Sequence, residues 1–321
     1  MATRHQVLQA LRDSDTPVSG EQLARKLNIS RNAVWKAIRA LQAEGYRIDA
    51  APNRGYRLTE SPDIISEAEI RRWLTQTEIG NLMEIRGTLD STNNLAKELA
   101  AHGAPHGTLV AAETQTAGRG RFSRRFYSPP HTGIFISFIL RPSLPAERAA
   151  MITSMAAVAV AQAIESLSGL HPGIKWVNDV IVGRKKCCGI LCEAGVSCES
   201  GRLDWLVAGI GVNVGRMDFP PDLAEIATSV ENECGTPVCR SRLIAEIANR
   251  IAALYGELDS GAFMEECRSR SVVIGREITV LSGNEPCQAK AIDIDGQGRL
   301  IILRADGTQE TLNSGEISIR L

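Results

Sequence analysis

The sequence predicts an α+β protein with three consecutive parts, and three observations support this fold class. The chain has 321 residues, which exceeds the length of one ordinary domain. Its first sixty residues show capped helical segments, its middle alternates strands with helices, and its last fifty residues show strands alone. We therefore expect a helical module at 1–60, a central mixed α/β domain at 61–270 and a small β-barrel at 271–321.

Composition restricts where such a protein works. Hydrophobic residues make up 44% of the chain and charged residues 23%, which suffices for a buried core. The longest uncharged run, 149–164, is too short to cross a bilayer, and the first residues do not resemble a secretory leader. We expect a cytoplasmic protein with no membrane contact.

Charge is distributed unevenly along the chain. Residues 1–60 contain ten lysines and arginines but six acidic residues, although the whole chain carries a net charge of −1. A basic module on an acidic body indicates an anionic partner for that module alone.

The cysteines indicate a reduced protein without a fixed metal centre. Four of the eight cysteines, at 187, 188, 192 and 198, fall in one short segment. Their C-C-x3-C-x5-C spacing is not that of zinc ligands, and no histidine lies nearby. The surrounding sequence, KKCCGILCE, instead predicts a buried strand in which cysteine is a small apolar residue.

The N-terminal module has the signals of a helix-turn-helix. Ser19 and Gln22 form a capping box that opens a short helix, and Asn28 is suited to end it. Ser30 caps the next helix, over 31–44, which is long enough to act as a recognition helix. With a first helix over 2–13, the expected inward residues are Val7, Leu8, Leu11, Leu23, Leu27, Val34, Ala37, Ile38 and Leu41.

The third helix and the segment after it carry basic side chains that point outward. The helix is thin enough to enter the DNA major groove. The sequence YRIDAAPNRGYRL predicts a two-stranded wing with Arg54 near its tip, so the module reads as a winged helix-turn-helix. The alternative is a three-helix interaction module with a solvated charged face. The candidate DNA-binding residues are Arg31, Asn32, Trp35, Lys36, Arg39 and Arg54.

A polar break at 60–63 precedes the central domain, in which strands and helices alternate without a repeat. The predicted strands are 83–89, 108–115, 133–140, 173–183, 186–195 and 203–215, and the predicted helices are 95–103, 146–168 and a closing one around 243–254. In the last part we expect strands at 276–281, 287–294, 299–304 and 316–321, with hairpin turns at Asp295-Gly296 and Asp306-Gly307. Short strands joined in this way close into a small barrel.

Several familiar motifs fail on their spacing. GIGVNVG has its third glycine one position late and is followed by no βαβ unit, so it is not a dinucleotide fingerprint. DIDGQG places Arg304 where a calcium loop needs glutamate. The sequence contains neither a G-x-x-x-x-G-K-[ST] phosphate loop nor a G-x-S-x-G nucleophile elbow.

The most informative stretch is GRGRFSRRF at 118–126, which lies between two predicted strands. Its glycines let the backbone approach a ligand closely, and its arginines suit phosphate or carboxylate. Taken alone, it is more typical of a mobile surface loop than of a binding site. Two further segments favour a binding site. KWVND at 175–179 ends a strand with a lysine, and DSTN at 90–93 sets hydroxyls and an amide at a helix N-terminus, which suits a neutral polar ring.

These motifs, in this order, carry a resemblance that covers the full chain. The sequence resembles biotin protein ligases of the bifunctional kind that double as biotin operon repressors. The segments that carry the likeness are SGEQLARKL, SRNAVWKAI, DSTN, TQTAGRGR, KWVND, KCCGIL and GIGVNV. The resemblance implies a catalytic domain like class II aminoacyl-tRNA synthetases and an SH3-like C-terminal barrel.

The resemblance also implies the chemistry. Biotin's carboxylate attacks the α-phosphate of ATP to give biotinyl-5′-adenylate and pyrophosphate, and a lysine of a biotin carboxyl carrier protein then attacks the mixed anhydride. Two anions must meet in the first step, so it needs fixed cations and Mg²⁺ supplied with ATP. The arginine-rich loop becomes a lid that orders over the adenylate and excludes water.

Site residues follow from the resemblance, motif by motif. It implies catalytic roles for Lys175 and Arg121. Biotin contacts are implied for Ser91, Thr92, Asn93, Gln115, Arg119, Gly120, Arg121 and Lys175, and nucleotide contacts for Gly118, Arg119, Arg121, Asn178, Asp179 and Asn213. The sequence departs from the family's usual motif at Ser123, where a glycine is usual, at Phe126, where tryptophan is usual, and at Val177, where proline is usual.

The resemblance also implies binding partners, and two alternative functions stay open. The resemblance implies operator DNA upstream of biotin-synthesis genes and a homodimer that forms once the adenylate is bound. A ligase with a vestigial DNA-binding module and a non-enzymatic ligand-sensing repressor are the alternatives. A lipoate ligase poses the same carboxylate-activation problem but does not normally carry this DNA-binding module.

Overall fold

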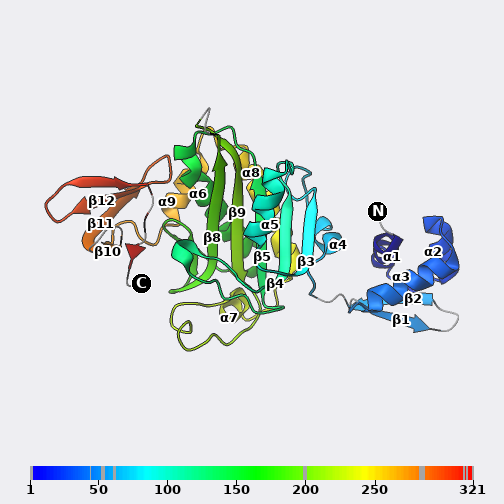
Figure 1. Ribbon diagram of the computed structural model, residues 1–321. Coiled ribbons are helices and arrows are strands. Elements are labelled where there is room, and N and C mark those ends of the chain that lie inside the picture. Colours follow the sequence, from blue (N-terminus) through cyan, green and yellow to red (C-terminus); the bar gives the residue numbers. More distant parts are fainter. Residues whose placement is uncertain are drawn as a thin grey trace. The chain divides into compact units, whose positions relative to one another are not determined.

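The computed structural model describes residues 3–43, 45–51, 55–60, 63–197, 201–281, 286–313, 315 and 317–319. The chain divides into two compact units, one up to Ile64 and the other from Ile65 to the end. Figure 1 draws both units, and each is described by itself.

The N-terminal unit has the predicted helices and wing strands. Its elements are α1 (Thr3–Arg12), α2 (Gly20–Leu27), α3 (Arg31–Ala43), β1 (Arg47–Ala51) and β2 (Gly55–Glu60). The capping box of Ser19 and Gln22 is present, and Asn28 ends α2 in the left-handed region with a φ of 52°. The amide of Ala33 donates to the hydroxyl of Ser30, which caps α3 as expected. The inward residues of α3 are all buried, so the helical periodicity predicted the core of this unit.

A seven-stranded sheet forms the centre of the other unit. Its described strands are β3 (Met83–Leu89), β4 (Leu109–Gln115), β5 (Gly133–Leu140), β6 (Gly173–Lys175), β7 (Asp179–Val182), β8 (Lys185–Val196) and β9 (Leu203–Asn213). They lie in the order β3-β4-β5-β9-β8-β7-β6. Only the β3–β4 pair is parallel among them, so the sheet is mixed. The single strand expected at 173–183 is instead a hairpin of β6 and β7, because the chain reverses at 176–178.

Helices cover both faces of this sheet, as Figure 1 shows. Helix α5 packs on β4, β5 and β9 from one side, and α6 and α8 lie on the other. Since both faces are covered, every residue of β5 is buried. The helices and 3₁₀ turns are α4 (Glu67–Arg71), α5 (Thr92–Ala101), η1 (Arg121–Ser123), η2 (Ala146–Arg148), α6 (Ala149–Ser168), α7 (Val230–Cys234), α8 (Arg240–Tyr255) and α9 (Phe263–Ser269).

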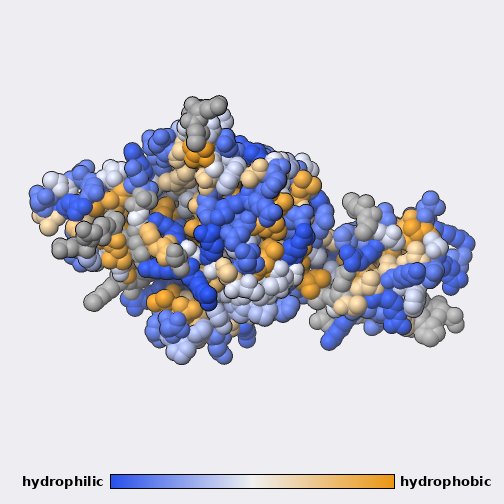
Figure 2. Space-filling view, in the orientation of Figure 1, coloured by the Kyte–Doolittle hydropathy of each residue, from blue (hydrophilic) through white to orange (hydrophobic). Residues whose placement is uncertain are grey.

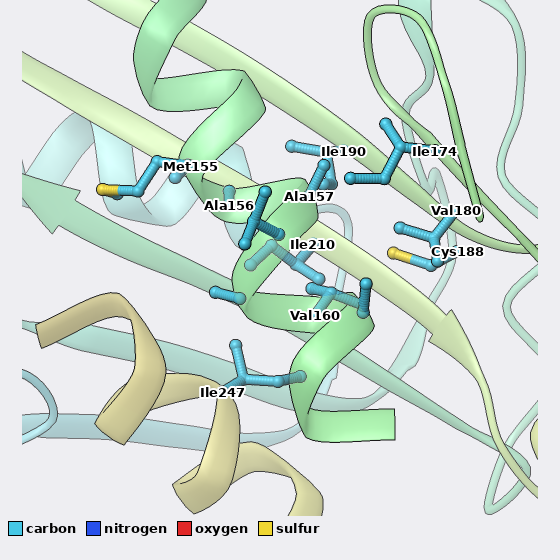
Figure 3. Close-up of a cluster of buried hydrophobic side chains, with 14 of the residues drawn as sticks. Met155, Ala156, Ala157, Val160, Ile174, Val180, Cys188, Ile190, Ile210 and Ile247 are labelled. Carbon is cyan, nitrogen blue, oxygen red and sulfur yellow. The ribbon is translucent and has the colours of Figure 1, made fainter. Parts of the chain in front are cut away.

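Helix α6 is the core helix of the unit. Figure 3 shows Ala156, Ala157 and Val160 of α6 beside Ile190 and Ile210 of the sheet. By length and composition alone, the segment Ala146–Ser168 could cross a membrane, but 72% of its most apolar stretch is buried inside the protein. Its small side chains let the helix approach the sheet closely. Figure 2 shows hydrophilic residues interspersed with hydrophobic ones on the face of the molecule in view.

The last part of the chain is a five-stranded antiparallel sheet. Its described strands, β10 (Glu277–Val280), β11 (Cys287–Ile294), β12 (Leu300–Arg304), β13 (Gln309–Leu312) and β14 (Ile317–Ser318), lie in the order β13-β12-β11-β10-β14. The sequence analysis missed β13, whose residues QETL are mostly polar. The chain reverses at both expected turns; Gly307 has a positive φ in the second turn, whereas in the first it is Gly298 rather than Gly296. The described pairings do not extend to closure of β13 on β14.

Candidate active site

A polar pocket lies where α5 begins, β4 ends, and β8 and β9 pass under the arginine loop, residues 118–126. Its wall carries hydroxyl, amide and guanidinium groups, and its floor carries glycines. The pocket brings together these predicted site residues: Ser91, Thr92, Asn93, Gln115, Arg119, Gly120, Arg121 and Asn178. Segments that are up to 120 positions apart in the sequence, from Ser91 to Gly211, therefore meet at one site.

Hydroxyl and amide groups form one wall of the pocket. Thr92 donates to Gln115 Oε1 through its backbone amide, at 2.8 Å, and through its hydroxyl, at 3.2 Å. Ser137 Oγ donates to Thr92 Oγ1 at 2.9 Å, which fixes that hydroxyl from below. Ser91 is buried, and its hydroxyl makes no hydrogen bond within the described residues. A buried hydroxyl of this kind is available to a polar ligand.

Asn93 has a structural role that the sequence analysis did not foresee. Its Oδ1 accepts from Ser137 Oγ at 2.7 Å, and its Nδ2 donates to Leu191 O at 3.1 Å and to Glu193 Oε2 at 2.9 Å. All three bonds go to protein atoms, so the amide ties α5 to β5 and β8. Asn93 thereby holds the start of α5, and with it Thr92, at the pocket.

Glycines and one aromatic ring form the floor. A methyl group added to Gly211 would lie 2.8 Å from the ring of Phe126, and one added to Gly189 would lie 3.3 Å from it. A methyl group on Gly209 would lie 1.9 Å from Asn93 Oδ1. The floor is therefore closed to side chains, and the ring at the position that departs from the family motif, Phe126, lies directly on it.

The arginine loop is folded down as a compact hairpin. The amide of Phe126 donates to Gly118 O at 3.0 Å, and that of Gly120 donates to Arg124 O at 2.8 Å. Gly118 lies outside the pocket lining; a methyl group there would lie 2.7 Å from Ser128 Oγ, so close packing requires glycine at this position. The loop thus holds its shape through its own backbone.

Arg121 connects the loop to two distant parts of the chain. Its Nη1 donates to Asn178 Oδ1 at 3.2 Å, and its Nη2 donates to Gly315 O at 2.8 Å. Asn178 in turn donates to Ile190 O at 3.0 Å. Arg121 and Asn178 also line a second, larger cavity that extends to Arg299, which directly precedes β12.

The lysine on the pocket wall is Lys186, not Lys175. Lys186 lies in β8, and its Nζ is 2.6 Å from Asp179 Oδ1. Lys175 ends β6, opposite Asp179 in the β6–β7 hairpin, and is half-buried outside the pocket lining. KKCCGILCE was interpreted only as a buried strand, so Lys186 was missed. The sequence signal that could have identified Lys186 was a lysine near the start of a predicted strand, followed three residues later by Gly189, which also lines the pocket.

Asn213 lies away from the pocket. It is buried, and its Nδ2 donates to Thr228 O at 3.1 Å, which fixes the segment that follows β9. Asp179 also lies outside the lining and reaches the pocket only through Lys186. The structure thus gives the predicted nucleotide residues unequal positions: Asn178 faces the pocket, while Asn213 and Asp179 support its surroundings.

Glu193 of β8 is a second residue that the sequence analysis missed. Partial burial opposes its ionisation, but the hydrogen bonds from Lys97 and Asn93 and the charges of Lys97 and Arg119 outweigh burial and lower the pKa of this carboxyl. Glu193 is therefore an anion beside the pocket at neutral pH. No sequence motif marks it, because its partners come from α5 and from the arginine loop.

In the N-terminal unit, the predicted DNA-binding residues of α3 form one exposed surface. Arg31, Asn32, Trp35, Lys36 and Arg39 are all exposed. Trp35 is 49% exposed, which is unusual for a tryptophan, and the guanidinium of Arg39 lies 5.7 Å from the centroid of its ring. Arg54 lies outside the described residues.

Three family models match consecutive parts of the chain. They are described as an HTH domain, over residues 3–57, the biotin/lipoate A/B protein ligase family, over 86–213, and the biotin protein ligase C terminal domain, over 273–320. The chain is 37% identical to the bifunctional ligase/repressor BirA of Bacillus spizizenii, over 91% of each chain. The chain belongs to the biotin protein ligase family.

More distant relatives agree with this membership. The bifunctional ligase/repressor BirA of Escherichia coli is 26% identical over 94% of this chain and 92% of its own length. The biotin protein ligase of Aquifex aeolicus, solved in complex with biotin and ATP, is 26% identical with a TM-score of 0.63, covering 74% of this chain and 97% of its own. The family, the ligase class and the three-part fold expected from the sequence are thereby confirmed.

Proposed function

We propose that the protein is a biotin protein ligase that also represses biotin-synthesis genes. It forms biotinyl-5′-adenylate from biotin and ATP and transfers the biotinyl group to a lysine of a biotin carboxyl carrier protein. The single observation that carries this proposal is the pocket itself, which combines neutral hydrogen-bonding groups with three cationic side chains, Arg119, Arg121 and Lys186. The bifunctional relatives and the Aquifex aeolicus complex with biotin and ATP support the choice of substrates.

The neutral wall suits the ureido ring of biotin. Ser91 offers an unshared hydroxyl, while Thr92 and Gln115 are held in place by their mutual hydrogen bonds. A ureido ring presents N–H donors and a carbonyl acceptor but no charge, so it is matched by hydroxyl and amide groups.

Two of these cations, Lys186 and Arg121, suit the first chemical step. A carboxylate oxygen of biotin attacks the α-phosphorus of ATP, a P–O bond forms, and the bond to pyrophosphate breaks. Lys186 and Arg121 are the pocket-lining groups that offset the repulsion between these anions and stabilise the charge that develops. Asp179 positions Lys186 through their 2.6 Å contact. We therefore assign to Lys186 the catalytic role that the resemblance implied for Lys175.

Mg²⁺ belongs to the ATP substrate in this proposal. Magnesium is usually held by substrate phosphates with one or two carboxylates. Within the described part of the chain, no three acidic, histidine or cysteine side chains come together as a metal site. Asp179 is the carboxylate next to the pocket-lining lysine, and it fits the role of a single protein ligand to a phosphate-bound ion.

In the second step, the acceptor lysine attacks the carbonyl carbon of the mixed anhydride and AMP leaves. The loop arginine Arg121 holds the adenylate until the carrier protein arrives, and the larger cavity beside it leaves space for an approaching side chain. Closing the loop over the anhydride excludes water, which would otherwise hydrolyse it.

The N-terminal unit gives the second activity. The exposed surface of α3 fits the major groove of an operator upstream of biotin-synthesis genes. A dimer formed in the adenylate-bound state would present two such modules to two half-sites. The protein acts in the cytoplasm, where ATP, carrier protein and DNA are all accessible.

One reaction tests the ligase. The full chain is incubated with Mg²⁺, ATP labelled at the α-phosphate, and either biotin or lipoate as the acid. Labelled biotinyl-adenylate in the first arm supports the proposal. Labelled adenylate from lipoate alone would instead assign lipoate ligase activity to the pocket, since the matched family includes both kinds of ligase. Absence of a product from either acid would contradict the proposed activity.

A further inference from the structure

Arg119 of the arginine loop is bound to two other parts of the protein through one guanidinium nitrogen. Its Nη1 lies 3.2 Å from Glu193 Oε1 and 3.0 Å from Asn94 Oδ1. The Asn94 side chain is itself fixed, because its Nδ2 donates to Asp90 Oδ2 at 2.6 Å. The guanidinium of Arg119 therefore donates to two oriented oxygen atoms, one on β8 and one on α5.

We infer that Glu193 is a positioning residue for the ligase reaction, because it latches the arginine loop closed through Arg119. This inference rests on the proposed function and gives Glu193, which lies outside the pocket lining, a defined role. It also assigns the side chain of Arg119 to holding the loop rather than to holding phosphate.

The latch reaches the pocket through the backbone of the loop. Arg119 pairs with Arg125 as an isolated bridge, and the amide of Phe126 bonds Gly118 O. These bonds make the loop move as one piece, so fixing Arg119 also fixes Phe126. The Phe126 ring lies against the glycine floor at Gly189 and Gly211. Releasing the latch therefore loosens the side of the pocket that shields a bound adenylate.

The charges around Glu193 make this latch reversible. Lys97 Nζ lies 2.7 Å from Glu193 Oε1, and Lys97 belongs to α5 rather than to the loop. When Arg119 leaves, Glu193 is still paired with Lys97 and hydrogen-bonded to Asn93, so no half-buried anion is left without a partner. Arg119 is 45% exposed, so its pair with Glu193 is partly screened by water and weak enough to open.

Two variants separate a latch from a structural support. Glu193→Gln keeps an acceptor for the Asn93 amide but loses its attraction for both cations. Lys97→Gln breaks the same Lys97–Glu193 pair but changes no residue of the loop. In this variant Arg119 is the remaining ion-pair partner of Glu193 among the described residues. Both variants lose the Lys97–Glu193 ion pair, so if Glu193 only supported the fold through that pair, they would behave alike.

The first measurement is escape of preformed, labelled biotinyl-adenylate into an excess of unlabelled ligand. We expect Glu193→Gln to release it roughly threefold to tenfold faster than wild type, a range typical of losing one charged hydrogen bond at a partly exposed site. Lys97→Gln should release it at the wild-type rate or more slowly. Arg119→Gln should match Glu193→Gln, and the double variant should release it no faster than either.

The second measurement needs no chemistry by the enzyme. The loop contains four arginines and is a substrate for trypsin once it opens. In the ligand-free full chain, Glu193→Gln should be cut within 118–126 faster than wild type and faster than Lys97→Gln.

Equal adenylate escape and equal cleavage in both variants would overturn the latch while leaving the ligase intact. A wild-type chain that forms no adenylate, yet shows the expected order of cleavage, would overturn the proposed function and leave the latch standing.

Discussion

Lys186 and Lys175 show how much two residues of the same type can differ in position. Lys175 ends the three-residue strand β6, Lys186 is the second residue of the twelve-residue strand β8, and both lie near Asp179 in the register of the sheet. Only Lys186 lines the pocket, and only Lys186 has its Nζ at 2.6 Å from the carboxylate. The chemistry of the site at this scale depends on which lysine faces the ligand.

Replacing Lys186 by glutamine should therefore slow adenylate formation by about 10²- to 10³-fold, the usual cost of removing one group that stabilises developing charge. Lys175→Gln is the matched control and should lose much less. Single-turnover formation of labelled adenylate distinguishes them. A severe loss in Lys175→Gln with normal rates in Lys186→Gln would restore the role that the resemblance implied for Lys175.

Arg121 should matter more for retention than for synthesis, because it bonds parts of the protein on either side of the loop. We expect Arg121→Ala to form adenylate but to leak it as a reactive anhydride. Leakage is measured as biotinylation of lysines on an unrelated protein in the same tube. Wild-type levels of such labelling in the variant would contradict this role.

At the scale of elements, close packing around the glycines of β9 positions α5. Asn93 is held by three hydrogen bonds and lies where a side chain on Gly209 would need to be. Gly209→Ala should displace the start of α5, weaken biotin binding and cost about 1–3 kcal/mol of folding free energy. Gly87 of β3 is the control, since a methyl group there meets nothing within 4 Å. Thermal unfolding and biotin titration check both variants. Unchanged stability and biotin affinity in Gly209→Ala would show that the Asn93 side chain can move aside at little cost.

Helix α3 offers an equally direct contrast between neighbours. Val34 is fully buried, so Val34→Ala should destabilise the N-terminal unit by about 2 kcal/mol. Trp35 is exposed, so Trp35→Ala should leave stability unchanged and weaken DNA binding. Denaturant unfolding and fluorescence anisotropy with a duplex from upstream of biotin-synthesis genes separate the two effects. Unchanged affinity in Trp35→Ala would remove the tryptophan from the DNA interface.

For the whole molecule, the question is how the two activities are coupled. If the adenylate favours an assembly that binds DNA, operator affinity should rise when biotin and ATP are present and fall with added salt as counterions are released. Unbiotinylated carrier protein should oppose repression by consuming the adenylate. Footprinting with and without biotin plus ATP measures this, and Lys186→Gln should abolish the response to ATP. Equal protection in every condition would contradict the coupling, and no protection in any would favour a ligase without repressor activity.

The sequence by itself determined the elements and the motifs that carry chemistry. The capping box at Ser19 and Gln22, the buried stripe of α3 and the continuous apolar strand β5 all follow from local rules of periodicity and capping. The arginine loop likewise predicted a site that binds an anionic ligand. These features were predictable because each depends on residues that are neighbours along the chain.

Only the tertiary structure decided which side chains meet. Strand pairing brings Asp179 opposite Gly189 and sets Lys186 on the pocket wall, and the folded loop brings Arg119 to Glu193 across 74 positions of sequence. It also gave Asn93, which lines the pocket, an unforeseen role as a tie between α5 and the sheet. The register of non-neighbouring strands fixes these contacts, and that register depends on the packing of whole elements rather than on any local pattern.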